Sequence, residues 1–205
     1  RQIPIEGKSK ARAGVVSESA WVNQADIRPS FPSLGDIERD KPFTLAFWIH
    51  RPKKNLTGAV VSRMDEAKDY RGWDVWLEGD RIGMHFVNRW PENAIKVLSG
   101  EPLPAETWTH VAIAYDGTSK ASGFQILFNG VAIKKEVKSD LLSDSVRTAV
   151  PFRIGSRSQQ SPTPDVALQD LRLYSVALPA KQIDAIKSNE RGAYLVNRIS
   201  KEANS

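Results

Sequence analysis

One eight-residue stretch, WTHVAIAY at Trp108–Tyr115, constrains the fold of this chain more than any other part of the sequence. Its residues alternate with the two-residue period of a β-strand, which places every second side chain on the same face. One face would hold Thr109, Val111, Ile113 and Tyr115, and the other would hold Trp108, His110, Ala112 and Ala114. Turn residues flank the stretch, with Pro104 before it and Asp116-Gly117 after it. The pattern predicts a central strand that is buried on at least one face.

Two tight turns predict antiparallel pairing between neighbouring strands. Residues 124–129 form an apolar run that ends at Asn129-Gly130, a dipeptide typical of two-residue hairpins. We therefore expect residues 131–137 to pair with that run. Glu78-Gly79-Asp80 joins the runs at residues 73–77 and 81–87 in the same way.

Other short strands, separated by turn residues, are predicted at residues 43–49, 59–64, 94–98, 152–155 and 166–174. Residues 15–27 fit either one or two short strands or a loop, and the polar residues 138–149 are expected to form a loop. Helical spacing occurs only near the end, where Pro179 suits a first turn and Ile183 and Ile186 share a face, so a helix is predicted at residues 179–187. The fold class is therefore all-β, an antiparallel jelly-roll β-sandwich with one short C-terminal helix.

Composition sets the number of domains and excludes several classes of partner. With 205 residues and 40% hydrophobic content, the chain can form one substantial core, which we place at residues 15–188 between an arm at 1–14 and a helical segment or tail at 189–205. The chain has no Cys, so disulfides and thiolate metal sites are excluded. No apolar run approaches the about 18 residues that span a bilayer, so no membrane insertion is expected. The net charge of +5 is not clustered, so no nucleic-acid partner is expected.

Five segments carry a resemblance to a known family. They are PFTLAFWI (42–49), WTHVAIAYDG (108–117), FQILFNG (124–130), FRIGSR (152–157) and LQDLRLYSVALPAKQIDAI (168–186). In order and spacing they resemble the laminin-G-like domains of the concanavalin A-like lectin/glucanase superfamily, over about residues 30–187. A further segment, RWPENAIKVLSGEPLP (89–104), resembles the version embedded in large exported proteins of planctomycete-type bacteria, beside c-type cytochrome-like modules.

The resemblance implies a jelly roll of two antiparallel sheets, with ligand sites on a concave face or in rim loops. It also implies an extracellular or periplasmic location, and neighbouring domains of the same parent protein as partners. We therefore expect a noncatalytic carbohydrate-binding module whose ligand is a polysaccharide or glycan. The alternative is a structural or protein-interaction domain that packs against neighbouring modules without binding sugar.

The sequence does not predict an enzyme. Glycoside hydrolysis needs two carboxyl groups about 5–9.5 Å apart, and the catalytic members of the superfamily carry clustered carboxylates on one strand. No Glu-x-Asp-x-(x)-Glu pattern occurs here, and the strand at 73–78 reads WDVWLE. No nucleophile-elbow motif supports Ser-His-Asp catalysis.

The three histidines and three tryptophans form one candidate ligand site. His50, His85 and His110 are opposite in parity to the apolar residues of their strands, so they would project from a common sheet face. Trp48, Trp76 and Trp108 share that parity. The set fits a sugar-binding platform or a zinc site, and the alternative, which we favour, is that Trp48, Trp108 and His110 are packed framework residues.

Two loops form the second candidate site. The segments DYRGW (69–73) and NRWPEN (88–93) combine aromatic, guanidinium and amide groups, which binding loops on a rigid sandwich often use. The alternative is that Trp90 is folded over the edge of the core. The predicted ligand-binding residues, from both sites, are Tyr70, Arg71, Trp73, Trp76, His85, Arg89, Trp90 and Asn93.

Calcium is the one cofactor that the resemblance suggests. Asp170 occupies the closing strand where relatives keep an acidic residue, so we expect it to have a structural or calcium-adjacent role. The acidic segment DEAKD (65–69) could also offer oxygen ligands, although a solvated loop is the alternative that we favour. Many relatives have Phe-Asp-Gly near the domain start, whereas this chain has Asp26-Ile27-Arg28, which weakens the case for calcium.

Overall fold

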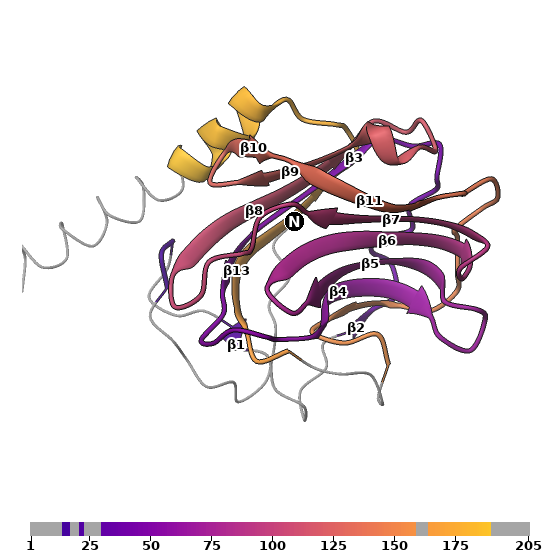
Figure 1. Ribbon diagram of the computed structural model, residues 1–205, viewed down its shortest axis with the longest axis horizontal. Coiled ribbons are helices and arrows are strands. Elements are labelled where there is room, and N and C mark those ends of the chain that lie inside the picture. Colours follow the sequence, from indigo (N-terminus) through magenta and orange to yellow (C-terminus); the bar gives the residue numbers. More distant parts are fainter. Residues whose placement is uncertain (1–13, 17–20, 23–29, 159–163, 190–205) are drawn as a thin grey trace, which may run out of the picture.

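Two antiparallel β-sheets form a sandwich in the computed structural model (Figure 1), which describes residues 14–16, 21–22, 30–158 and 164–189. One sheet has the strand order β1-β13-β3-β8-β9-β10, and the other has the order β11-β7-β6-β5-β4-β12-β2. One short helix, residues 180–189, follows the last strand in the part of the chain that the structure describes. The predicted all-β jelly-roll sandwich with a short C-terminal helix is therefore confirmed.

The element bounds are as follows. The six-stranded sheet contains β1 (Trp21–Val22), β3 (Phe43–His50), β8 (Trp108–Tyr115), β9 (Phe124–Phe128), β10 (Val131–Ile133) and β13 (Ala167–Tyr174). The seven-stranded sheet contains β2 (Ser30–Phe31), β4 (Gly58–Asp65), β5 (Arg71–Glu78), β6 (Arg81–Arg89), β7 (Asn93–Ser99), β11 (Lys135–Asp140) and β12 (Phe152–Ile154). A short 3₁₀ turn, η1 (Ala121–Gly123), precedes β9.

The two predicted tight turns are present. Asn129 and Gly130 both have positive φ, 52° and 86°, as a two-residue hairpin of this kind requires, and they join β9 to β10. Gly79, with φ of 64°, and Asp80 join β5 to β6, whose register pairs Glu78 with Arg81. Turn chemistry therefore fixes the register of both hairpins.

The expected pairing of residues 131–137 with the preceding strand is confirmed as far as Ile133 and is wrong beyond it. The chain forms β10, which pairs with β9, and then crosses to the other sheet, where β11 pairs with β7. The backbone N–H of Gly100 donates to the carbonyl of Lys134 at 2.7 Å and fastens the crossing point. Strand β11 also takes residues as far as Asp140 from the segment that was expected to be a loop. Period-two alternation continues through such a crossing, so the pattern alone does not reveal a change of sheet.

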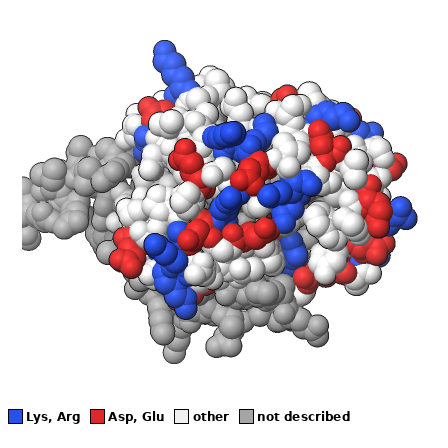
Figure 2. Space-filling model, in the orientation of Figure 1, with Lys and Arg blue, Asp and Glu red and all other residues white. Residues whose placement is uncertain are grey.

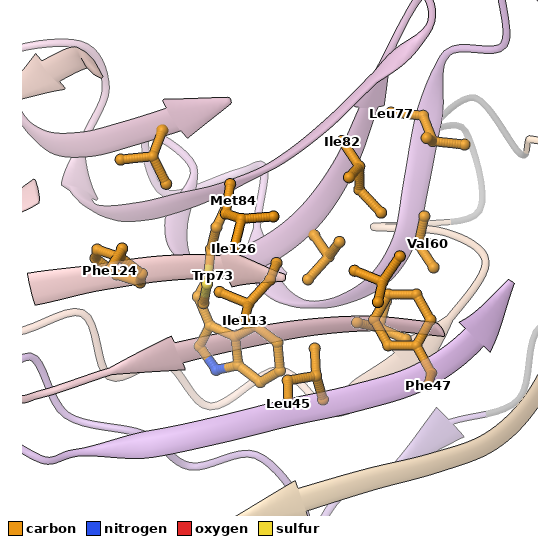
Figure 3. Close-up of a cluster of buried hydrophobic side chains, with 14 of the residues drawn as sticks. Leu45, Phe47, Val60, Trp73, Leu77, Ile82, Met84, Ile113, Phe124 and Ile126 are labelled. Carbon is orange, nitrogen blue, oxygen red and sulfur yellow. The ribbon is translucent and has the colours of Figure 1, made fainter. Parts of the chain in front are cut away.

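The hydrophobic core lies between the two sheets. Figure 3 shows Leu45, Phe47 and Ile113 from the six-stranded sheet facing Val60, Met84 and other side chains of the seven-stranded sheet. Burial of this apolar surface is the main favourable contribution to folding.

The helix covers the outer face of the six-stranded sheet (Figure 1). Ile183 packs there against Ala112, Ala114 and Leu127, and the small side chains of the two alanines let the helix approach the strands closely. Strand β8 is therefore buried on both faces. The carbonyl of Pro179 accepts the N–H of Ile183, so Pro179 caps the helix and the first helical residue is one later than predicted.

Several predictions concern segments outside the described residues. They include the N-terminal arm, the tail beyond residue 189 and the Asp26-Ile27-Arg28 segment. Within the described ranges, no helix has the length and the hydrophobicity to cross a membrane.

Trp73→Ala tests the core. Trp73 is 1% exposed and its Nε1 donates to the carbonyl of Gly35 at 2.8 Å. We expect the free energy of unfolding to fall by roughly 3–5 kcal/mol, because truncation leaves a cavity and an unpaired carbonyl. Urea unfolding measures the change, and Val176→Ala at an exposed position should cost under about 0.5 kcal/mol. Similar losses in the two variants would contradict this description of the core.

Candidate functional site

Strand register arranges the outer face of the seven-stranded sheet in rows. Residues paired in succession across β4, β5, β6 and β7 form an apolar row of Met64, Gly72, Val87 and Ala94, followed by a polar row of Ser62, Asp74, His85 and Lys96. At Gly72, with φ of 131°, an added Cβ would lie 2.0 Å from the carbonyl oxygen of Arg63, so only glycine fits there.

A pocket of about 240 Å³ lies over these rows. It is lined by Met64, Tyr70, Trp76, Glu78, His85, Val87, Trp90, Lys96 and Arg157. Most of its lining comes from the outer face of β5 and β6 and from the turns beside them, and Arg157 enters from the segment after β12. The pocket therefore combines aromatic, apolar and charged side chains on a rigid sheet.

A buried carboxylate organises the pocket. Asp74 is 0% exposed; its Oδ1 lies 2.8 Å from His85 Nδ1, and its Oδ2 accepts a hydrogen bond from Arg157 Nε. Burial alone would raise the pKa of the Asp74 carboxyl, but His85 and Arg157 together hold this pKa below its usual value. Asp74 is therefore an anion that fixes the orientation of both neighbours.

Aromatic rings surround this charged group. The Arg157 guanidinium lies 3.9 Å from the ring centroid of Trp76 and 5.5 Å from that of Tyr70, both within cation–π range. Trp90 meets His85 edge to face, with ring centroids 5.5 Å apart, and packs on the apolar row. The rings, His85 and Arg157 thus hold one another in place.

Lys96 and Glu78 add a second ion pair to the pocket. Lys96 Nζ lies 2.5 Å from Glu78 Oε2 and 5.9 Å from the ring centroid of Trp90. Over the face of the molecule that Figure 2 shows, Lys and Arg side chains are interspersed with Asp and Glu, without a large patch of one sign.

The structure gathers four of the predicted ligand-binding residues in this pocket: Tyr70, Trp76, His85 and Trp90. The rim placement of Trp73 is wrong, because its side chain belongs to the core between the sheets (Figure 3). Trp73 and Trp76 are three residues apart on one strand, so they point to opposite faces.

The other three predicted residues lie outside the pocket lining. Arg71 Nε donates to the carbonyl of Asn88, and Arg89 is exposed and lies near Glu92. The Asn93 side chain bonds to Ser143 and Asp144, so it holds a loop instead of facing a ligand.

Sequence reasoning missed five lining residues: Met64, Glu78, Val87, Lys96 and Arg157. Glu78 could have been found, because it shares its parity on β5 with Asp74 and Trp76. Arg157 could not, because it reaches Asp74 across 83 residues of sequence.

The common face predicted for the histidines is wrong. His50 and His110 lie on β3 and β8 of one sheet and His85 lies on β6 of the other, so they occupy opposite outer faces of the sandwich. Alternation fixes side-chain direction only within a sheet.

The packing alternative agrees with the surroundings of Trp48 and His110. Both are buried, their rings meet edge to face with centroids 5.3 Å apart, and burial lowers the pKa of His110 to about 4. Among the described residues, however, Trp48 Nε1 and His110 Nδ1 have no hydrogen-bond partner. Trp108 is only partly buried and packs edge to face on His50.

The Asp170 carboxylate forms an ion pair within its own strand. Its carboxylate pairs with Arg172, whose Nε lies 2.9 Å from Oδ1, and Asp170 has a positive φ of 52° at an irregularity in β13. The acidic segment at 65–69 begins with the last residue of β4 and continues into the turn before β5. No group of three or more potential metal ligands occurs in the part of the chain that the structure describes. Calcium therefore stays a prediction.

Comparison with known proteins identifies the class of domain. A family model described as the concanavalin A-like lectin/glucanases superfamily matches residues 17–184, so the chain belongs to this superfamily. The match is to a laminin G type of domain, as the sequence motifs predicted.

A receptor sequence and two solved structures are similar to this chain. The adhesion G-protein coupled receptor V1 of Danio rerio is 30% identical over 146 residues, which are 69% of this chain and 2% of the receptor. The binding domain of Paraclostridial Mosquitocidal Protein 1 superposes with a TM-score of 0.69 at 13% identity, over 89% of this chain and 46% of that domain. The CBM40 of a Ruminococcus gnavus sialidase, bound to α2,3 sialyllactose, gives a TM-score of 0.57 at 15% identity, over 71% of this chain and 82% of that module. The identities of 13% and 15% to the two solved structures show the fold alone. This chain spans only a small part of the receptor.

Asp74→Asn tests the buried network, because it removes the charge and keeps the side-chain shape. At pH 7 we expect the free energy of unfolding to fall by roughly 3–5 kcal/mol, because a buried ion pair loses one charge. The folded-state pKa of Asp74 lies below the unfolded value of about 3.9. The extra free energy of unfolding of the wild type over Asp74→Asn is therefore fully present above the unfolded-state pKa of Asp74. It is lost as the pH falls through the lowered folded-state pKa.

Urea unfolding at pH 7 and at acid pH measures this difference. The matched control is Asp36→Asn, which removes the ion pair of Asp36 with Arg147 at the surface and should cost less than about 1 kcal/mol. Equal losses in the two variants, or an Asp74→Asn difference that does not change with pH, would show that Asp74 is not a buried anion.

Proposed function

We propose that this domain is a noncatalytic carbohydrate-binding module and that the pocket over β5 and β6 holds the sugar. The observation that carries the proposal is the arrangement of aromatic rings around a fixed polar group. Tyr70, which is 39% exposed, and the partly exposed Trp90 flank a network of Asp74, His85 and Arg157. Aromatic surfaces pack on the C–H face of a pyranose, and fixed polar groups orient its hydroxyls.

His85 supplies one such polar group. Because Nδ1 of the imidazole faces the Asp74 carboxylate, the neutral ring carries its proton on Nδ1 and leaves Nε2 as an acceptor. The polar contacts of the His85 ring with Asp74 and Arg157 are both made at Nδ1 and not at Nε2. A sugar hydroxyl in the pocket could therefore donate to this atom.

The carboxylates of the pocket support a binding role over glycoside hydrolysis. Asp74 and Glu78 are four residues apart on β5, which is about 13 Å at about 3.3 Å per residue, whereas the two catalytic carboxyl groups of a glycosidase lie about 5–9.5 Å apart. Each carboxylate is also paired with a cation, Asp74 with Arg157 and Glu78 with Lys96.

The proposal extends to the parent protein through the resemblance alone. The segment at residues 89–104 resembles laminin-G-like domains of large exported planctomycete-type proteins that carry cytochrome c-like modules. We accordingly propose an extracellular or periplasmic module that holds such a protein on a polysaccharide. The alternative is a domain that packs against neighbouring modules and binds no sugar.

A glycan array with and without calcium, followed by calorimetry on the full chain, tests the function. Trp90→Ala should lower affinity for the sugars identified by roughly tenfold or more, which corresponds to about 1.4 kcal/mol or more of lost contact. Thermal unfolding should show that this variant remains folded, because Trp90 is only partly buried.

Trp108→Ala is the matched control, since Trp108 is also partly exposed but lies in the other sheet. It should retain full affinity. The fall in the free energy of unfolding should be smaller for Trp108→Ala than for Trp73→Ala, because Trp73 is fully buried. Full sugar affinity in folded Trp90→Ala would place the site elsewhere. Absence of any sugar binding, with tight association to flanking modules, would favour the alternative.

A further inference from the structure

Every formally charged group that lines the pocket has an opposite charge beside it. Lys96 pairs with Glu78, and Arg157 pairs with Asp74, which lies directly beneath the pocket surface. The two cations and the two carboxylates therefore cancel in formal charge. The Lys96 side chain is 16% exposed and the Glu78 side chain 46% exposed, so this pair lies at the pocket edge, where water screens it in part.

An acidic sugar would meet a cost in this pocket. Its carboxylate or sulfate would have to displace Glu78 from Lys96 or Asp74 from Arg157, because these cations already have anionic partners. Glu78, with 46% of its side chain exposed, would also repel it at the pocket edge. An anion that loses water without gaining an unpaired cation is destabilised.

The size of the pocket limits the ligand as well. Its volume of about 240 Å³ is below the about 300–1,000 Å³ of pockets that hold drug-sized molecules. The Trp76 face is also occupied in part by the Arg157 guanidinium, 3.9 Å from the ring centroid. The same guanidinium lies 5.5 Å from the Tyr70 ring centroid, so the aromatic surface open to a ligand is limited to the exposed parts of Tyr70 and Trp90 and suits one sugar ring.

We propose that the pocket selects a single uncharged pyranose residue, at a chain end or branch of a glycan, over sugars that carry a carboxylate or a sulfate. This inference rests on the proposed sugar-binding function and adds the class of ligand. Tyr70 and Trp90 pack on the ring, His85 Nε2 accepts a hydroxyl, and the balanced ion pairs exclude acidic sugars.

Calorimetry of the full chain against matched pairs of methyl glycosides tests the selection. The neutral probes are methyl glucoside and methyl galactoside, and the acidic probes are methyl glucuronide and methyl galacturonide, all in the same buffer. We expect the better neutral probe to bind at least about tenfold more tightly than its acidic partner, a difference of about 1.4 kcal/mol. Equal or tighter binding of the acidic partner overturns this inference but leaves sugar binding intact. Binding of neither series, with none on a glycan array, overturns the proposed function and the inference with it.

Glu78→Gln should make the pocket more favourable to acidic sugars, because it removes the anionic partner of Lys96 and leaves one unbalanced positive charge. We expect the ratio of acidic to neutral affinity to rise by about fivefold or more, and the gain to shrink at high salt. Glu136→Gln is the matched control, since Glu136 pairs with Arg81 and Lys138 on the same sheet but does not line the pocket. An unchanged ratio in folded Glu78→Gln, or the same rise in both variants, overturns the charge-balance explanation.

Discussion

The carboxylate of Asp74 is buried on the outer face of the seven-stranded sheet. The arrangement of the pocket depends on the burial of this charge. A carboxylate with no exposed surface must be paired, because an isolated buried charge is strongly destabilising. His85 reaches Asp74 from the neighbouring strand, and Arg157 reaches it from the segment after β12. Arg157 then lies against the rings of Trp76 and Tyr70. The buried anion therefore positions two of the side chains that line the pocket, His85 and Arg157.

Strand β5 separates the requirements of the fold from those of the site. Trp73, Val75 and Leu77 face the core between the sheets, while Asp74 and the other alternate residues face the pocket. The core can therefore keep its close packing while the outer face carries charged and aromatic groups. Loops at the sheet edge add Tyr70 and Trp90, which complete the pocket without altering the strand register.

Local patterns were sufficient to predict most of the fold. The strand β8 and the Asn129-Gly130 turn each depend on residues that are close together in the sequence. Both are present as expected. Features that depend on contacts between distant segments could not be predicted from the sequence. The chain changes sheet between β10 and β11, and the histidines lie on opposite faces of the sandwich. For the site, the aromatic residues of two loops and of β5 could be identified from their types. The role of Arg157 depends on a contact across 83 residues, which no local pattern encodes.

The central claim is that a glycan binds over β5 and β6 and not on the six-stranded sheet. The chain has six Trp residues, whose indole N–H groups give separate signals in a ¹⁵N-correlated NMR spectrum. Titration with a glycan that binds should shift the signals of Trp76 and Trp90 and leave those of Trp48 and Trp108 unchanged. Shifts at Trp48 and Trp108 with none at Trp76 and Trp90 would contradict the account and place the ligand on the opposite face.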